Sequence, residues 1–387
     1  MLVLRFSIQK DAQPIREEEV VAGSRDDRSS AKWKIIHAKE GRDMPAIAVT
    51  PEIESLARAG AFFVFSASGG KDSGAAASVA NEWLNSVGHA RDRRLMLHAD
   101  LARAEWPDTL DTIKAVANRL SLPLETVQAP RDLLWRFEDR WRRSLVRYAE
   151  LETIKLTPPW SSSNSLFCRS EQKAVQLSKR KARLPGELPV VGVIGIRREE
   201  SVGRSKAPIA APDTEMLRRN GREGVLWNPI VEWTADQVFA YHAERNIPLH
   251  RAYSLGSTRL SCALCVMCSH NDAFVSVTKG GNISQYRAYV SLELRSAFSF
   301  QPNRWLADLT NDYQTEPQAL VDAKRIAMER IEIQSRIPSA LVIRKSILNL
   351  SVTEAEVLAS ARSAVADLYG ISIEGRTAAD ILRRSRQ

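Results

Sequence analysis

The chain has few cysteines and no long hydrophobic run. No apolar run in its 387 residues reaches the roughly eighteen residues of a membrane span, so we expect no membrane segment. Its four cysteines are too few for the disulfide framework of a secreted protein of this size. The N-terminal apolar stretch, Met-Leu-Val-Leu-Arg-Phe-Ser, is too short for a signal peptide. We therefore expect a cytoplasmic protein.

Positive charge exceeds negative charge along the chain. Its 55 Lys and Arg against 46 Asp and Glu give a net charge of +9 and a pI of about 9.5. This balance suits a polyanionic partner such as nucleic acid, although nucleotide substrates alone would also account for it. Arginine-rich stretches such as 136–147 are equally consistent with solvated helix faces. The apolar and charged fractions, 44% and 26%, are ordinary for a globular protein.

Strands and helices are predicted to alternate between residues 51 and 270. The expected strands are 61–67, 94–99, 124–128 and 190–196, and the expected helices are 74–86, 108–120, 132–149 and 170–181. This alternation predicts an α/β fold whose mostly parallel sheet has helices on both faces. Ligands bind such folds outside the carboxyl ends of the strands. We divide the chain into a polar N-terminal arm, a nucleotide-binding α/β domain with a cysteine cluster, and a mainly helical C-terminal region, at 1–50, 51–270 and 271–387.

Local signals also place three later helices. Thr234 followed by Gln237 is a capping-box pattern, which predicts a helix from there to about Arg245. After residue 270 the pattern becomes helical and charged, and we expect amphipathic helices at 324–336 and 354–368.

The run Ser68-Gly69-Gly70-Lys71-Asp72-Ser73 follows the first expected strand and precedes a helix. Backbone N–H groups of such a loop, together with the helix dipole, bind phosphate oxygens. Gly69 and Gly70 can adopt positive φ, Lys71 adds a cation, and Ser68 and Ser73 add hydroxyl donors. The run does not follow G-x-x-x-x-G-K-[ST], so it is not a Walker P-loop. A surface turn that contains Gly-Gly is the alternative interpretation.

Two other polar groups end expected strands. Asp100 follows the second strand, where a carboxylate can hold Mg²⁺ or a ribose hydroxyl. An ordinary helix entry at Pro107 and Asp108 does not account for Asp100. Arg197 ends a later strand, where arginine can bind phosphate oxygens with both arms of its guanidinium. The surrounding Arg-Arg-Glu-Glu is also a common surface run.

Three of the cysteines form two consecutive C-x2-C steps, Cys262, Cys265 and Cys268. With Cys168 the count reaches four, enough for a Cys₄ iron–sulfur cluster or a structural zinc ion. Arg259 nearby would stabilise thiolates. Buried inert cysteines, or a catalytic thiol pair without metal, are the alternatives.

These pieces occur in a fixed order that resembles the phosphoadenylyl-sulfate (PAPS) reductase-like family of the PP-loop ATP pyrophosphatase superfamily. The resemblance is strongest to the branch that contains the sulfur-transfer subunit of DNA phosphorothioation, and it covers about residues 60–270. The series comprises the Ser-Gly-Gly-Lys-Asp-Ser loop, Asp100 with Trp106-Pro107-Asp108-Thr109, Phe167-Cys168-Arg169 with Lys173, Gly195 to Ser201, Asn228-Pro229-Ile230 with Trp233-Thr234, and Pro248, Tyr253, Gly256 and Arg259 before Cys262-x2-Cys265. The family fold is an adenine-nucleotide alpha-hydrolase-like α/β layer structure.

The resemblance also implies roles for individual residues. Phosphates or sulfate would be bound by Ser66, Ser68, Gly69, Gly70, Lys71, Asp72 and Ser73. Asp100 would lie near the nucleotide or Mg²⁺, and it joins Lys71 and Asp72 as the expected catalytic residues. Arg197, Glu200 and Ser201 would line the same site. The four cysteines would hold a 4Fe-4S cluster, with zinc as the alternative, although the spacing of Cys268 departs from the pattern expected of a ligand.

We therefore expect a nucleotide-activating sulfur transferase. ATP with Mg²⁺ would bind at the loop, cleavage between the α and β phosphates would adenylate an acceptor oxygen, and a sulfur nucleophile would displace AMP. The expected partners are a nucleic-acid acceptor, a cysteine desulfurase and other subunits of a modification system, and the N-terminal arm and C-terminal region suit a subunit interface.

Two alternatives remain, a PAPS or APS sulfonucleotide reductase and a nucleotide- or DNA-binding subunit with a structural metal. Thioredoxin-linked reductases of the family carry a cysteine near the C-terminus, and residues 269–387 contain none. Cluster-containing reductases have an adjacent Cys-Cys pair, which is also absent. Both departures weigh against sulfonucleotide reduction.

Overall fold

The computed structural model describes residues 45–162, 165–216, 223–260, 262–311, 316–344 and 349–385. These residues belong to one compact unit of the chain. Residues 1–44, almost all of the predicted N-terminal arm, lie outside the described residues.

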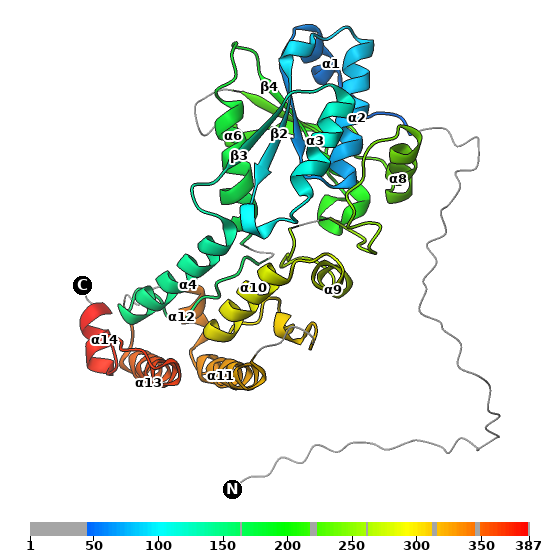
Figure 1. Ribbon diagram of the computed structural model, residues 1–387. Coiled ribbons are helices and arrows are strands. Elements are labelled where there is room, and N and C mark those ends of the chain that lie inside the picture. Colours follow the sequence, from blue (N-terminus) through cyan, green and yellow to red (C-terminus); the bar gives the residue numbers. More distant parts are fainter. Residues whose placement is uncertain are drawn as a thin grey trace, which may run out of the picture. The chain divides into compact units, whose positions relative to one another are not determined.

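Six strands in the described part of the chain form one sheet with the order β3-β2-β1-β4-β6-β5. All neighbouring strands are parallel except β5 and β6, which confirms the predicted, mostly parallel sheet (Figure 1). The chain order reverses between β1 and β4, and open α/β sheets bind ligands beside such a reversal. The strands are β1 (Phe62–Ala67), β2 (Arg94–Asp100), β3 (Leu124–Gln128), β4 (Val190–Val193), β5 (Ala210–Pro212) and β6 (Gly224–Trp227).

Both faces of the sheet are buried, because alternate side chains of each strand point to opposite faces. Phe63 and Phe65 of β1 belong to one core cluster, and Val64 between them belongs to another. The first cluster is covered by α1 (Pro51–Arg58), α2 (Lys71–Ser86), α3 (Thr109–Leu120) and α8 (Ala235–Glu244), and the second by α6 (Val175–Lys181). The predicted helices on both faces are confirmed.

A long amphipathic helix, α4 (Leu133–Ala149), leads from the sheet to the C-terminal helices (Figure 1). Its apolar side chains, such as Phe137 and Trp141, share a core cluster with Tyr289 and Val365 of the C-terminal region. That region is helical, as predicted, and the boundary at residue 270 stays a prediction. Its helices are α9 (His270–Thr278), α10 (Ile283–Ser296), α11 (Pro317–Ser335), α12 (Ser339–Arg344), α13 (Val352–Tyr369) and α14 (Ala378–Ser385).

Side-chain caps fix several helix starts. Thr234 and Gln237 form the predicted capping box at the start of α8, Ser351 and Glu354 form another at α13, and the Asp132 carboxylate accepts from the first turn of α4. None of the helices in the described residues is long and apolar enough to cross a membrane.

Candidate functional site

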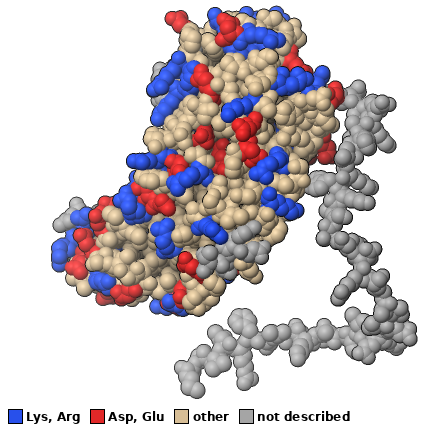
Figure 2. Space-filling model, in the orientation of Figure 1, with Lys and Arg blue, Asp and Glu red and all other residues tan. Residues whose placement is uncertain are grey.

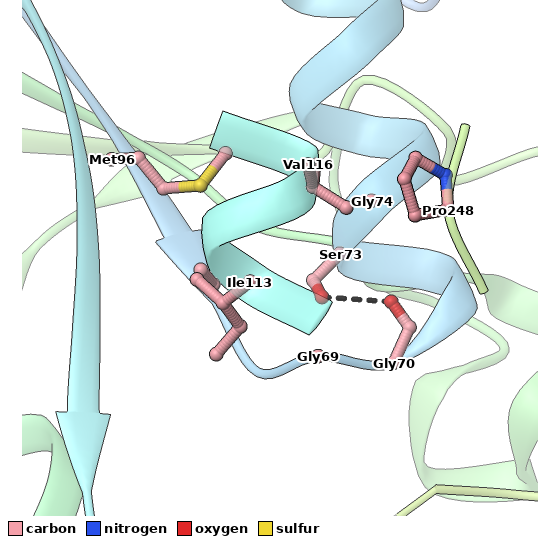
Figure 3. A pocket seen from close by; sticks show the side chains of 9 residues that line it. Gly69, Gly70, Ser73, Gly74, Met96, Ile113, Val116 and Pro248 are labelled. Carbon is pink, nitrogen blue, oxygen red and sulfur yellow. Dashed lines mark hydrogen bonds between the residues drawn. The ribbon is translucent and has the colours of Figure 1, made fainter. Parts of the chain in front are cut away.

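The glycine-rich loop connects β1 to α2 and is held by its own hydroxyl groups. Gly69 adopts φ +73°, a conformation that favours glycine. The Ser73 hydroxyl donates to the Gly70 carbonyl at 2.9 Å (Figure 3). It also accepts from the Ser68 N–H at 3.3 Å. Within the described part of the chain, the N–H groups of Gly69 and Gly70 donate to no protein acceptor. The loop therefore presents backbone donors to an anion at the start of α2.

A small pocket lies beside this loop (Figure 3). Its volume of about 10 Å³ is room for about one water molecule. The wall opposite the loop, formed by Met96, Ile113, Val116 and Pro248, is apolar. The pocket is lined by Ala67, Gly69, Gly70, Ser73, Gly74, Met96, Ile113, Val116 and Pro248.

Lys71 is buried at the first position of α2 and is directed to its neighbour. Its Nζ donates to Asp72 Oδ2 at 2.9 Å and lies 5.5 Å from the ring centre of Phe239. Arg197 holds the other oxygen of this carboxylate, with Nε 2.7 Å from Oδ1. Burial alone would lower the pKa of Arg197, but the charge of Asp72 and the bonds to Asp72 and Glu199 raise it. The Asp72 carboxylate is thus paired with two cations, Lys71 and Arg197, and a phosphate group could bind the same two cations.

The loop after β4 reaches α2 because residue 195 is glycine. A Cβ at Gly195 would lie 2.4 Å from the Asp72 carbonyl oxygen. Glu200 accepts from the Arg197 N–H at 3.0 Å and pairs with Arg204. The structure thereby brings Arg197 to Asp72 and places Glu200 behind Arg197, whereas Ser201 is exposed on the next turn. Ser66 lies near the end of β1 and is half-buried.

Asp100 belongs to a group of three residues at the carboxyl end of β2. One ligand atom each of His98, Asp100 and Glu105 lies within 4.8 Å of the others, a spacing at which they could hold a cation. His98 Nδ1 lies 3.0 Å from the Ala67 carbonyl at the end of β1, and its Nε2 lies 3.2 Å from Glu105. Burial alone would lower the pKa of His98, but the bond to Glu105 and its charge raise it. The group therefore lies next to the phosphate-binding loop.

His98 and Glu105 were missed from sequence. His98 could have been predicted, because it stands two residues before Asp100 and therefore on the same face of the strand. Glu105 has no comparable local signal, because it follows a short turn (Ala102–Ala104) whose geometry brings it back to the strand end.

The structure brings the four cysteines together beside a buried apolar core. Cys168, Cys262 and Cys268 pack against one core cluster, and the thiols of Cys168, Cys262 and Cys265 are close enough for their charges to interact. Cys268 lies beside Cys265, since their thiols also interact and the Cys268 N–H donates to the Cys265 carbonyl at 3.0 Å. Burial is the main cause that raises the pKa of Cys262 to about 12.

The surroundings of the cysteines fit an anionic metal centre. Burial alone would lower the pKa of Lys173, but the charges of Cys262, Glu105 and the other thiols raise it. The buried Tyr289 hydroxyl, beside the same thiols, has no hydrogen-bond partner within the described residues. Met267 N–H donates to Cys265 Sγ at 3.4 Å. A cation and two donors are thus available to thiolates or to sulfide.

No three sulfur atoms of the cysteines, all of which lie in the described residues, are within 4.8 Å of one another. Four thiolates around zinc lie about 3.8 Å apart, because each Zn–S bond of a tetrahedral site is about 2.3 Å. Within the described ranges, His98, Asp100 and Glu105 form the group whose ligand atoms lie within 4.8 Å of one another, and the cysteines form no such group.

One segment joins the phosphate loop to the cysteines. The Tyr253 hydroxyl accepts from the Lys71 N–H at 3.0 Å, and burial raises the pKa of Tyr253 to about 12. Leu260 packs over Gly69 and Gly70. Cys262 follows two residues later, so this segment covers the loop and then enters the cysteine motif.

Asp108 anchors the same segment. Arg251 Nε lies 2.6 Å from Asp108 Oδ2, and His250 Nε2 lies 3.5 Å from Oδ1. The neighbouring Thr109 contacts Gly69. The Trp106-Pro107-Asp108-Thr109 run therefore positions both the loop and the segment above it.

Comparison with known proteins agrees with this arrangement. The family model described as "Phosphoadenosine phosphosulfate reductase domain" matches residues 63–268, which is more than half of the chain. The chain is similar to an adenosine 5'-phosphosulfate reductase of Rhizobium tropici, at 29% identity over 75 residues that make up 19% of this chain and 38% of the relative. It is also similar to an enzyme of the same name from Oceanobacillus iheyensis, at 30% identity over 74 residues, 19% of this chain and 28% of the relative.

The alignments thus span about a third of the length of these curated relatives. A solved structure, the phosphoadenylyl-sulfate (PAPS) reductase of Candida auris in a phosphate complex, aligns with a TM-score of 0.34 and 16% identity over 56% of this chain and 98% of that one. A likeness at this level carries no argument about function.

Proposed function

Because this chain belongs to the phosphoadenosine phosphosulfate reductase domain family, we propose that it is a nucleotide-activating sulfur transferase that cleaves ATP between the α and β phosphates. The observation that carries the proposal is the junction between two sites. The segment that covers the phosphate-binding loop through Tyr253 and Leu260 continues into the cysteine motif at Cys262. A nucleotide bound at the loop would therefore lie next to a sulfur-rich centre.

In the first step an acceptor oxygen attacks the α phosphorus. The new O–P bond replaces the bond to the β phosphate, and pyrophosphate leaves with the electron pair. Lys71 and the N–H groups of Gly69 and Gly70 stabilise the charge of the departing pyrophosphate. To do so, Lys71 exchanges its pairing with Asp72 for a phosphate oxygen, and Arg197 keeps Asp72 in place.

Magnesium bound with the nucleotide would neutralise phosphate charge. Asp100 would hold it, together with His98 and Glu105 of the same group. In the second step, sulfur at the oxidation level of hydrosulfide attacks the adenylated centre and displaces AMP. No electrons are gained or lost in that step.

We propose that Cys168, Cys262, Cys265 and Cys268 hold a 4Fe-4S cluster, which would supply a binding site for the transferred sulfur. Three features support this. No three of the cysteine sulfurs in the described residues lie within 4.8 Å of one another, Lys173 supplies a cation beside the thiols, and the Tyr289 hydroxyl is an unused donor within the described residues.

The proposed acceptor is a backbone phosphate of nucleic acid, as in DNA phosphorothioation, with a cysteine desulfurase as sulfur donor and other subunits as partners. Two thiols of a reductant would supply the two electrons that convert the persulfide sulfur of the desulfurase to hydrosulfide. The net charge of +9 supports a polyanionic acceptor. On the face shown in Figure 2, basic and acidic side chains are interspersed. The charge on that face is therefore not concentrated in one basic patch.

A second candidate function is sulfonucleotide reduction, because both curated relatives are named as adenosine 5'-phosphosulfate reductases. Release of sulfite would consume two electrons from thiols, and the chain has no adjacent Cys-Cys pair. The sequence also left open a nucleotide- or DNA-binding subunit with a structural metal, and such a subunit would bind ATP without releasing pyrophosphate.

The deciding experiment measures two products from protein purified without oxygen. We expect pyrophosphate from ATP in the presence of a nucleic-acid acceptor, and no sulfite from PAPS or APS with thioredoxin. Lys71→Ala should lower pyrophosphate release about 100-fold or more, whereas the control Lys179→Ala, an exposed lysine of α6, should not. Equal release by Lys71→Ala and the wild type would reject the proposal, and sulfite would favour the reductase.

A further inference from the structure

Glu293 of α10 is a completely buried carboxylate that is held by backbone groups. Its Oε1 accepts from the N–H groups of Phe300 at 2.7 Å and Leu306 at 2.8 Å, and its Oε2 accepts from Ala307 at 2.9 Å. No lysine or arginine of the described residues forms an ion pair with it. Burial raises its pKa to about 7. Burial of a carboxyl group without a cation costs free energy of folding. The bonds of Glu293 to the backbone hold both ends of the loop 300–307.

Two side chains of this loop reach the cysteine motif. Gln301 and Arg304 bond to each other through their backbones, at 3.2 and 3.0 Å. Gln301 Nε2 lies within hydrogen-bond distance of three carbonyls, those of Cys265 at 3.2 Å, Val266 at 2.9 Å and Cys268 at 3.0 Å. Arg304 Nη2 donates to the Cys268 carbonyl at 2.8 Å.

These contacts fix the turn 265–268 from its carbonyl side. On the other side, the Met267 N–H is directed to the Cys265 sulfur at 3.4 Å. The loop also packs closely on Cys268, since the pocket that they line together has a volume of about 10 Å³, room for about one water molecule.

We propose that Glu293, Gln301 and Arg304 form a clamp that presets Cys265 and Cys268 as ligands. The clamp consists of a buried carboxylate that shapes the loop 300–307 and of two donors that hold the turn 265–268. Its role as a ligand clamp rests on the proposed metal centre. These three are positioning residues, because they touch the ligand backbone and not the sulfur atoms.

The test compares Gln301→Leu with Gln334→Leu in the full chain purified without oxygen. Both glutamines are 8% exposed, but Gln334 lies in α11 and its Nε2 has no hydrogen-bond partner within the described residues. We expect Gln301→Leu to speed iron loss to a chelator about tenfold, because the turn 265–268 loses the side-chain amide that donates to its carbonyls. Amide exchange in the peptide 262–268 should rise as well. Gln334→Leu should change neither rate.

Glu293→Gln is the second variant. It keeps the shape of the side chain but replaces the oxygen that accepts from the Ala307 N–H with an NH2 group, which is a donor. The rates of iron loss and of amide exchange in 262–268 should therefore rise, while β1 exchanges at its wild-type rate. Amide exchange in 262–268 that is unchanged in both variants would overturn the clamp. If the wild type holds no metal, the proposed cluster and the ligand role fail together, and the exchange data still decide whether the three residues hold the turn.

Discussion

Gly195 illustrates how one residue can control the geometry of the site. We predict that Gly195→Ala destabilises the protein by about 1–3 kcal/mol, because overpacking of this kind cannot relax against main-chain atoms. The added Cβ would lie 2.4 Å from the carbonyl oxygen of Asp72 and 2.5 Å from its carbonyl carbon. ATP affinity should fall too, since Asp72 would shift relative to Lys71. Urea unfolding and a nucleotide titration measure the two effects.

The control for this change is Gly203→Ala. The nearest side-chain atom to a Cβ at Gly203 is 4.0 Å away, so this variant should unfold and bind ATP as the wild type does. If Gly195→Ala matched Gly203→Ala in both measurements, the close contact between the β4 loop and α2 would be wrong.

At the residue scale, the sequence singles out residues that form local runs. The phosphate loop and the C-x2-C steps are short patterns whose residues lie together in the structure, and their roles in the site stay predictions. The sequence could not show that the Ser73 hydroxyl is used inside the loop, or that Lys71 is directed to Asp72. Gln301 could not be found either, because its partners lie more than thirty residues away and no spacing rule links them.

At the element scale, the strands and helices with clear periodicity were predicted well. β3 (Leu124–Gln128) agrees at both ends, and β1 and β2 differ from the prediction by one residue at one end. The predicted strand 190–196 ends at Val193, because the chain then turns toward α2 at Gly195. β5 and β6 were missed, since three and four residues are too few for a periodic pattern.

The segment between α8 and the cysteine motif carries a prediction at this scale. We expect Tyr253→Phe to bind inorganic pyrophosphate about fivefold more tightly, because the Lys71 N–H loses a hydrogen bond of about 1 kcal/mol and becomes available to the anion. Tyr253 now accepts that N–H at 3.0 Å. Calorimetric titration of pyrophosphate measures the change.

Tyr241→Phe is the matched control. Its hydroxyl donates to Ser78 Oγ at 3.2 Å. Ser78 also belongs to α2, but it lies about two turns beyond the phosphate loop. This variant should lose a similar amount of stability without any gain in pyrophosphate affinity. Weaker binding by Tyr253→Phe would instead mean that the hydroxyl helps to hold the anion.

At the scale of the whole molecule, the cysteines lie where α4 and the C-terminal helices share a core. Phe137 of α4, Leu264 of the cysteine motif, and Tyr289 of α10 belong to one cluster. Trp160 stacks on Tyr289 with ring centres 5.9 Å apart. This arrangement joins segments that the sequence separated at residue 270, and periodicity gives no information on which helix faces pack together.

The shared core gives a prediction about metal removal. Anaerobic removal of iron with a chelator should lower the free energy of unfolding by several kcal/mol, because bound metal stabilises only the folded state, by about 2.7 kcal/mol for a ligand at 100 times its Kd. The loss should include the C-terminal helices, since residues of α10 pack on the same core as the cysteines. Urea unfolding, followed by tryptophan fluorescence and by circular dichroism, measures it.

Cys262→Ser separates this effect from damage by the chelator. The variant should unfold as easily as the metal-free wild type, and the chelator should not weaken it further, because the same centre would be missing in both. An untreated variant that unfolds like the untreated wild type would mean that Cys262 holds no stabilising metal. A destabilisation confined to the cysteine motif, with α10 and α13 unfolding at the wild-type urea concentration, would contradict the coupling through the shared core.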